Sequence, residues 1–389
     1  MLNGIWHNPT KIIFGKQNED IIGEEIAKHS KNILFHYGGK SIHTIGLYDK
    51  IIKSLKRSQI KFTELGGVKP NPRSDLVYQG IDVCRRNDID FVLAVGGGSV
   101  IDSAKVIALG TPYEGDFFDF SNQAVPQGAL KIGTVLTIPG AGSESSPAAV
   151  ISHEDKGIKY PYFSKHMIPK FSILNPEYSL SLSPAQTSAG IVDAISHVLE
   201  RYFSDTPYVA LTDRICEALI KTLVQYGTQI VSDPDNYELR AEIMWACKLA
   251  HDDTAGFGRQ HDWACHGIVH EIAVEYDSVH GEALAVVFPA WMKYVMAHKQ
   301  EKLLQFAHRV MDVPHGLDPK NSIIQAIESY QSFLKTMGMP TSLEQLGVMD
   351  DTKFQTIAEN SVRFMQSGTI GNFMRLKPDD TVKILKLAS

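Results

Sequence analysis

The sequence has few of the features that mark secreted, membrane-spanning or disulfide-bonded proteins. Its 389 residues contain four cysteines, which lie far apart and form no CxxC pair. Reduced thiols in a cytoplasmic protein are therefore expected. No uninterrupted apolar run is long enough to cross a bilayer, and the N-terminus lacks the basic segment and apolar run of a signal peptide.

The sequence also lacks an excess of positive charge. Lys and Arg number 38 against 44 Asp and Glu, and the formal net charge is -6. The chain therefore has no basic surplus to attract nucleic acid or acidic lipid. Internal repeats and low-complexity segments are absent as well. What remains is a composition of 43% hydrophobic and 21% charged residues, typical of a globular protein, at a length that favours two domains.

The first half of the sequence alternates between strand-like and helix-like segments. Strand patterns occur at residues 11–15, 32–37, 61–65, 90–95, 133–138, 148–152 and 169–174. Helical patterns occur at residues 20–29, 42–57, 74–86 (with Ser74 as N-cap) and 100–109. This rhythm predicts an α/β domain with a largely parallel sheet covered by helices.

After residue 180 strand-like runs become rare. Helical patterns occur at residues 184–202, 209–225, 237–252, 261–275, 283–298, 302–311, 321–337 and 350–359. We therefore expect an α/β domain over residues 1–180 and an all-helical domain over residues 181–389.

Four side chains in the second half form a candidate metal site. Asp193 and His197 are four residues apart, which places both on one face of a helix. His266 and His280 would complete a set of one carboxylate and three imidazoles, suited to iron(II) or zinc. An isolated pair of this kind is more often a solvated or capped helix face. The apolar residues around the first pair indicate burial instead, and buried ionisable groups need partners.

Two neighbours of this set leave alternatives open. His270 lies four residues after His266, so it is expected one helical turn along, near the metal but not on it. It is either a proton relay or a packed histidine beside the ligands. Cys265 is either a fifth ligand candidate or a buried structural thiol, and we favour the thiol.

Glycine-rich turns in the first half suit a dinucleotide. One turn directly follows a buried strand and opens a helix, where backbone N–H groups can approach a pyrophosphate. Its residues are Gly96, Gly97, Gly98 and Ser99. The spacing is not G-x-G-x-x-G, and a tight strand–helix turn is the alternative. Asp102 and Lys105 follow on the same helix, as ligand contacts or as a surface pair.

A second turn bears on cofactor choice. It consists of Gly38, Gly39, Lys40 and Ser41. No acidic residue, which would accept from a ribose 2′-hydroxyl and repel a 2′-phosphate, occurs from Tyr37 to Leu47. Lys40 tolerates a 2′-phosphate, so NADP(H) is more likely than NAD(H); an ordinary solvated lysine is the alternative. A third glycine-rich loop follows Thr137.

Together these motifs resemble the iron-containing (group III) alcohol dehydrogenase family, in its butanol dehydrogenase-like branch of NADPH-dependent aldehyde reductases. The resemblance rests on motifs spread over nearly the whole chain, at residues 11–15, 37–39, 69–72, 96–102, 137–139, 142–144, 192–194, 262–266 and 279–280. The branch usually carries glycine where Lys40 stands and lysine where His43 stands.

The resemblance implies a fold, an activity and site residues. The fold is a Rossmann-like domain followed by a helical metal-binding domain, the dehydroquinate synthase-like arrangement. The activity is NAD(P)-dependent alcohol dehydrogenase, acting on a short-chain alcohol or aldehyde in a homodimer. Metal ligands carry over onto Asp193, His197, His266 and His280, and the additional active-site histidine onto His270. Cofactor contacts carry over onto Gly38, Gly39, Ser41, Asn71, Gly96, Gly97, Gly98, Ser99, Asp102, Thr137 and Lys159.

Three other functions share part of this pattern. A metal-dependent lyase or synthase of the same fold would use the glycine turn, but the segment from Asp262 to His266 argues against it. A metallohydrolase would not need dinucleotide loops. A non-catalytic nucleotide or metal sensor would bind cofactor without oxidising it.

Overall fold

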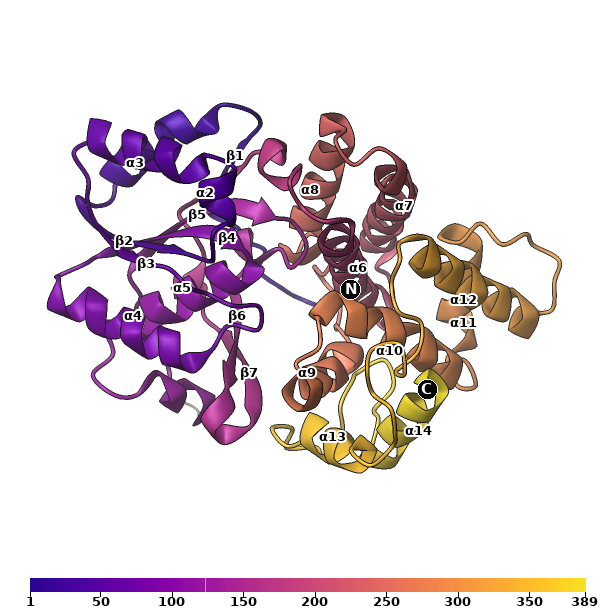
Figure 1. Cartoon of the computed structure of the whole chain (residues 1–389). Coiled ribbons are helices and arrows are strands. Elements are labelled where there is room, and N and C mark those ends of the chain that lie inside the picture. Colours follow the sequence, from indigo (N-terminus) through magenta and orange to yellow (C-terminus); the bar gives the residue numbers. More distant parts are fainter. Residues whose placement is uncertain (123) are drawn as a thin grey trace. The chain divides into compact units, whose positions relative to one another are not determined.

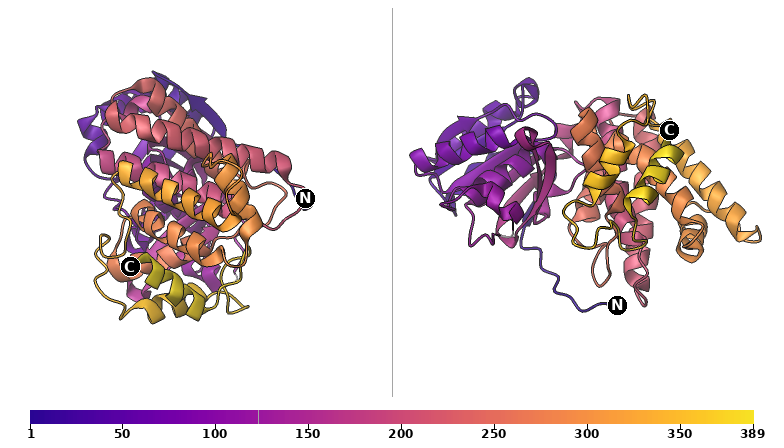
Figure 2. Two further views of the ribbon diagram at one scale, coloured as in Figure 1. Left: turned by 90° about the vertical axis from the view of Figure 1, so that its right-hand side faces the viewer. Right: turned by 90° about the horizontal axis from the view of Figure 1, so that it is seen from below.

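The computed structural model describes residues 1–122 and 124–389, and the chain divides into two compact units. The sheet unit consists of His7–Leu182 and Asn236–Met244. The helical unit consists of Met1–Trp6, Ser183–Asp235 and Trp245–Ser389. The first ten residues form neither helix nor strand, and they run as an extended segment (Figure 2).

A six-stranded parallel sheet lies at the centre of the sheet unit (Figure 1). Its order is β1-β8-β5-β4-β2-β3, and β6 and β7 form a separate antiparallel pair. The strands are β1 (Lys11–Phe14), β2 (Asn32–Tyr37), β3 (Lys61–Leu65), β4 (Phe91–Gly97), β5 (Lys131–Ile138), β6 (Ala148–His153), β7 (Ile158–Phe163) and β8 (Phe171–Leu174). The helices are α1 (Ile22–Ala27), α2 (Ser41–Thr44), α3 (Leu47–Arg57), α4 (Ser74–Arg86) and α5 (Gly98–Gly110). The predicted α/β architecture is confirmed.

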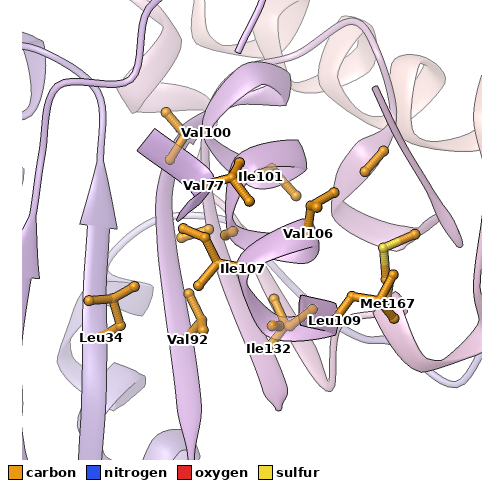
Figure 3. Packing of buried hydrophobic residues seen from close by; sticks show 14 of the residues in the cluster. Leu34, Val77, Val92, Val100, Ile101, Val106, Ile107, Leu109, Ile132 and Met167 are labelled. Carbon is orange, nitrogen blue, oxygen red and sulfur yellow. The ribbon is translucent and has the colours of Figure 1, made fainter. Parts of the chain in front are cut away.

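The sheet is covered on both faces because successive residues of a strand point to opposite sides. On β2, Leu34 belongs to the core that also contains residues of α4 and α5, whereas Ile33 and Phe35 belong to a second core. Figure 3 shows the first core, in which Ile107 of α5 lies near Val92 of β4. Helix α5 is apolar almost all round and almost fully buried, as expected for a helix inside a domain.

Three details of the sheet unit differ from the prediction. Residues 42–57 form two helices, because Gly46 adopts a left-handed conformation with φ of 69° between them. Ser74 is the first residue of α4 and not its N-cap; Arg73 holds that position. Strand β7 was not predicted, because Pro161 interrupts its apolar pattern; in a two-stranded pair a proline is tolerated.

The helical unit contains long helices joined by loops. The helices of this half of the chain are α6 (Pro184–Tyr202), α7 (Ala210–Ser232), α8 (Tyr237–His251), α9 (Ala264–Tyr276), α10 (His280–Val295), α11 (Gln300–Arg309), α12 (Pro319–Thr336), α13 (Phe354–Ser361) and α14 (Pro378–Ala388). Helix α6 begins as predicted, because Ser183 accepts a hydrogen bond from the N–H of Gln186 in a capping box. Helix α14 was not predicted. Among the described residues, no helix has the length and apolar character needed to cross a membrane.

Candidate functional site

The predicted pyrophosphate turn lies where β4 ends and α5 begins. The strand is completely buried, and Gly97 is the N-cap of the helix. A Cβ atom on Gly96 would lie 2.5 Å from Cγ2 of Val100, and one on Gly97 would lie 3.0 Å from Cβ of Ile138. The glycines are therefore required by close packing inside the turn. The unpaired N–H groups of the first helical turn remain available to an anion.

Three of the predicted cofactor segments lie at one edge of the sheet. Strands β2, β4 and β5 are neighbours, with Tyr37 paired to Val95 and Gly97 paired to Ile138. The second glycine turn, residues 38–41, follows β2, and Thr137 lies near the end of β5. The carboxyl ends of adjacent parallel strands are where open α/β sheets bind dinucleotides.

Asp102 and Lys105 hold the loop after β5 and do not form a surface pair. The Asp102 carboxylate accepts from the hydroxyl of Ser143 at 2.6 Å and from the N–H of Val150 at 2.9 Å. Lys105 is completely buried, and its ammonium donates to Oγ of Ser143 at 3.0 Å and to the carbonyl of Ser146 at 2.8 Å. Burial lowers the pKa of Lys105 to about 8 and raises that of Asp102.

Asn71 and Lys159 come from different segments and meet directly. The ammonium of Lys159, a buried residue of β7, donates to Oδ1 of Asn71 at 2.8 Å. Asn71 has a φ of 52°, a left-handed conformation that asparagine tolerates better than most residues. The two residues therefore act as a pair within the sheet unit.

Lys40 is exposed at the start of α2. The carboxylate of Glu64, near the end of the neighbouring strand β3, accepts from the hydroxyls of Tyr37 at 3.1 Å and Tyr48 at 2.8 Å. Both carboxylate oxygens are thus engaged by phenols, which limits their use as acceptors for a ribose. Sequence reasoning missed Glu64, because it searched only the segment after β2.

The predicted metal ligands come together in the helical unit. Asp193, His266 and His280 each offer a donor atom, and these atoms lie within 4.8 Å of one another. His197 adjoins this cluster, with Nε2 at 3.3 Å from Oδ1 of Asp193. Helix α6 carries the first pair, α9 carries His266 and α10 carries His280.

Gly281 allows α10 to approach α6 closely. A Cβ atom at this position would lie 2.2 Å from the backbone oxygen of Ala189, one turn before Asp193 on α6. The neighbouring His280 places its Nε2 3.8 Å from Oδ1 of Asp193. A residue without a side chain is therefore what permits this meeting of two helices.

Glu200 is a functional residue that sequence reasoning missed. Its buried carboxylate accepts from Nδ1 of His266 at 2.9 Å and from the backbone N–H groups of His266 and Trp263 at 2.9 and 2.6 Å. A carboxylate so placed fixes the tautomer of a ligand histidine and raises its basicity. Glu200 lies seven residues after Asp193, on the same helix face, and this spacing was the available signal.

The donor chemistry of the cluster fits a divalent cation. Because Nδ1–H of His266 donates a hydrogen bond to Glu200, Nε2 of His266 carries the lone pair, and this buried atom has no hydrogen-bond partner among the described residues. Burial, reinforced by His266 and Arg201, lowers the pKa of His197 well below its usual range, so the imidazole is neutral. Neutral imidazoles with one carboxylate suit Fe²⁺ or Zn²⁺.

The segment before His266 is anchored on both sides. Oδ1 of Asp262 accepts from the N–H groups of Asn372 and Phe373 at 2.6 and 2.7 Å. Burial and the nearby Glu200 raise the pKa of Asp262 to about 8. Trp263 has a φ of 67° and sets its ring 5.2 Å from that of His266.

His270 and Cys265, whose roles the sequence leaves open, lie differently relative to the cluster of donor atoms. His270 is half-buried, and its ring stacks on that of His280 at 5.6 Å. Cys265 is fully buried, and burial raises the pKa of its thiol well above the ordinary value. Cys265 lies outside the cluster of donor atoms, which agrees with a structural thiol.

Comparison with known proteins gives consistent matches over the whole chain. Residues 9–176 match the iron-containing alcohol dehydrogenase family, and residues 187–389 match the C-terminal region of the Fe-containing alcohol dehydrogenase family. The chain belongs to the iron-containing alcohol dehydrogenase family. It is an oxidoreductase that uses a nicotinamide cofactor and a metal. Family membership therefore favours the dehydrogenase over the lyase, hydrolase and sensor interpretations.

Individual relatives cover almost the full length. The chain is 38% identical to the probable NADH-dependent butanol dehydrogenase 1 of Bacillus subtilis, over 99% of both chains. It is 35% identical to the NADPH-dependent aldehyde reductase YqhD of Escherichia coli, over 88% of both. The crystal structure of NADH-dependent butanol dehydrogenase A from Thermotoga maritima is 39% identical, with a TM-score of 0.96 over 100% of this chain and 99% of that one. The predicted fold is confirmed.

Proposed function

We propose that this alcohol dehydrogenase interconverts short-chain primary alcohols and aldehydes such as butanol and butanal. The observation that carries the proposal is the meeting of Asp193, His266 and His280 from three helices. Butanol dehydrogenases and an aldehyde reductase among its full-length relatives support this substrate class.

Asp193, His197, His266 and His280 would hold one divalent metal, iron(II) or zinc. When bound, the metal polarises the alcohol or carbonyl oxygen as a Lewis acid, and the nicotinamide carries the hydride. Glu200 keeps His266 in the tautomer that presents Nε2. Trp263, held through its backbone N–H by Glu200, places its indole ring beside the imidazoles of His197 and His266.

His270 is proposed to take up and release the substrate proton. Its imidazole is half-buried and packs against the ring of His280, so it lies beside the ligands. An imidazole titrates in the range needed for such a relay. Replacing His270 with Ala should change the pH profile of kcat and leave the metal content unchanged. An unaltered pH profile would show that His270 only packs beside the ligands.

NADP(H) is proposed as the preferred cofactor, held by residues 38–41, Asn71, residues 96–99, Asp102, Thr137 and Lys159. Lys40 is exposed at the second glycine turn, where it can meet a 2′-phosphate. The nearby carboxylate of Glu64 is engaged by two tyrosine hydroxyls. Relatives are named both as NADH-dependent and as NADPH-dependent enzymes.

We also propose a two-domain organisation that changes near residue 180, and a homodimer. Light scattering on the purified chain tests the dimer directly. Activity is tested by following reduced cofactor with butanal, and oxidised cofactor with butanol, for NADP(H) and NAD(H) in turn. The proposal requires turnover of butanal or butanol with at least one cofactor, and kcat/KM higher for NADPH than for NADH. Cofactor binding without turnover of any aldehyde or alcohol would contradict it.

A further inference from the structure

His197 and His266 are held in different ways. His266 is fixed by the Glu200 carboxylate, which accepts a hydrogen bond from its Nδ1–H. His197 has Nε2 near Asp193, and its buried Nδ1 has no hydrogen-bond partner among the described residues. A histidine that binds metal usually donates its second ring N–H to a carboxylate, a carbonyl or water. The orientation of His197 must therefore come from packing.

The ring of His197 packs against those of His251, His266 and Trp263, and His251 lies nearest. The ring centroids of His197 and His251 lie 4.1 Å apart with an interplanar angle of 49°. His251 is the last residue of α8 and is half-buried. At this separation neither ring can rotate about its Cβ–Cγ bond without displacing the other. The side chain of His251 therefore restricts the direction in which His197 presents its nitrogens.

Arg201 holds His251 in turn. Its Nη2 donates to Nδ1 of His251 at 3.0 Å, and its Nη1 donates to the backbone carbonyl of His197 at 2.8 Å. The guanidinium cannot accept a hydrogen bond, so Nδ1 of His251 carries the lone pair and Nε2 the proton. The guanidinium also lies over the ring of Trp263 at 4.8 Å. Arg201 is 3% exposed, so this arrangement is internal.

On helix α6, three residues of this arrangement are spaced four residues apart. Asp193, His197 and Arg201 follow each other along a single face. Several carboxylates face Arg201: Oδ1 of Asp253 lies 3.9 Å from its Nε, and Glu200 and Asp252 also interact with the guanidinium. His261 lies 3.6 Å from the Asp253 carboxylate. The guanidinium therefore joins the ligand helix to the end of α8 and to the start of α9.

We propose that Arg201 and His251 are positioning residues for His197, with the orienting role that Glu200 has for His266. The proposal rests on the metal site proposed above. Its consequence is that metal affinity depends on two side chains that are not ligands.

The test uses Co²⁺ added to the full-length, metal-stripped chain. Affinity is measured by competition with a chromophoric chelator, and ligand geometry by the visible spectrum of bound Co²⁺. His251→Ala should weaken binding roughly tenfold or more and alter the spectrum, as loss of an orienting partner does at other metal sites. His251→Phe keeps a ring against His197 and should recover most of the affinity, whereas Arg201→Gln should lose part of it.

A matched control is His315→Ala, because His315 stacks on His308 at 4.0 Å elsewhere in the helical unit. It should bind Co²⁺ within about twofold of the wild type, since it removes a stacked ring without touching the site. Wild-type affinity and spectrum in both His251→Ala and Arg201→Gln would overturn the proposal. Should His251→Ala fail to fold, Arg201→Gln is judged by the same criterion. If the wild type and His266→Ala bind Co²⁺ equally, the metal site itself is wrong, which is a separate failure.

Discussion

At the residue scale, one carboxylate controls the presentation of His266. Glu200 accepts both the ring N–H and the backbone N–H of His266, so it fixes the ring and the start of α9 together. Glu200→Gln keeps the shape of the side chain but removes its charge, which weakens the hydrogen bond and the basicity of the imidazole. We expect the affinity for Zn²⁺ to fall about tenfold or more, measured by chelator competition.

The control for this change is Glu217→Gln. Glu217 is also a buried carboxylate, and it accepts from Tyr202 and Gln305, both at 3.1 Å. Its replacement should lower the melting temperature but leave Zn²⁺ affinity intact. Equal losses of affinity in the two variants would show that the effect of Glu200 is general destabilisation.

Lys40 provides a second test at this scale. Lys40→Ala removes an exposed positive charge at the second glycine turn. An exposed ion pair contributes up to about 1 kcal/mol, so kcat/KM with NADPH should fall about two- to fivefold while that with NADH stays the same. Steady-state kinetics with both cofactors measures the ratio, and Lys31→Ala serves as a surface control. An equal change for both cofactors would mean that Lys40 does not contact the 2′-phosphate.

At the element scale, the contact between α6 and α10 depends on Gly281. A methyl group at Gly281 would collide with the backbone of Ala189, which cannot rotate away. Gly281→Ala should therefore separate the helices, cost roughly 1–3 kcal/mol of stability and move His280 from Asp193. Chemical denaturation and metal content measure the two effects.

The comparison variant is Gly227→Ala, within α7. There the new methyl group would lie 3.3 Å from Cγ2 of Ile191 and 3.4 Å from Cε of Met337, side-chain atoms that can yield. Metal content should be retained in this variant. Loss of metal in both variants, or in neither, would contradict the role given to Gly281.

The elements that sequence predicts well are those whose signals are local. Helix α6 was placed correctly because Ser183 and Pro184 mark its start and an apolar run follows. The helix expected at residues 42–57 was wrong because a glycine inside a helical pattern is ambiguous, and only the structure shows the left-handed φ at Gly46. Strand β7 lacks a continuous apolar pattern, since it pairs only with β6.

At the scale of the whole molecule, buried histidines link stability to pH. His36 is completely buried between the carbonyl of Leu65 and the hydroxyl of Ser103, and burial lowers its pKa to about 4. Between pH 6.5 and about 4 the unfolded chain binds a proton that the folded chain excludes. The stabilisation is complete above this window and is lost as pH falls through it, by roughly 3 kcal/mol from this residue.

Denaturation at about pH 7 and about pH 4.5 measures this loss. His36→Gln should be less stable than the wild type near neutral pH and should lose less stability on acidification. Part of the slope should remain, because burial also lowers the pKa of His153 to about 4. His7→Gln, at an exposed position, should follow the wild type. If His36→Gln lost as much stability as the wild type between these pH values, the acid sensitivity would have to come from other residues.

The sequence predicts those parts of the site whose chemistry follows from residue type and local spacing. The spacing of Asp193 and His197, and the glycine turn at residues 96–99, both carry their signal within a few residues. Glu200 has the helical spacing from Asp193 that could have indicated it, but the partners of Glu200, Arg201 and His251 are set by contacts between α6, α8 and α9. Spacing in the sequence can place such a residue on the ligand face of a helix, but tertiary packing decides which ligand it orients.

The most direct test of the central claim is metal-dependent turnover. Metal-stripped wild type and His266→Ala would be assayed for oxidation of NADPH and NADH with butanal, before and after addition of Fe²⁺ or Zn²⁺. We expect negligible turnover without metal, recovery in the wild type on addition, and little recovery in His266→Ala, which lacks a donor of the cluster. Turnover that is the same with and without metal, or the same in both proteins, would contradict the assignment of Asp193, His197, His266 and His280 as the catalytic metal site.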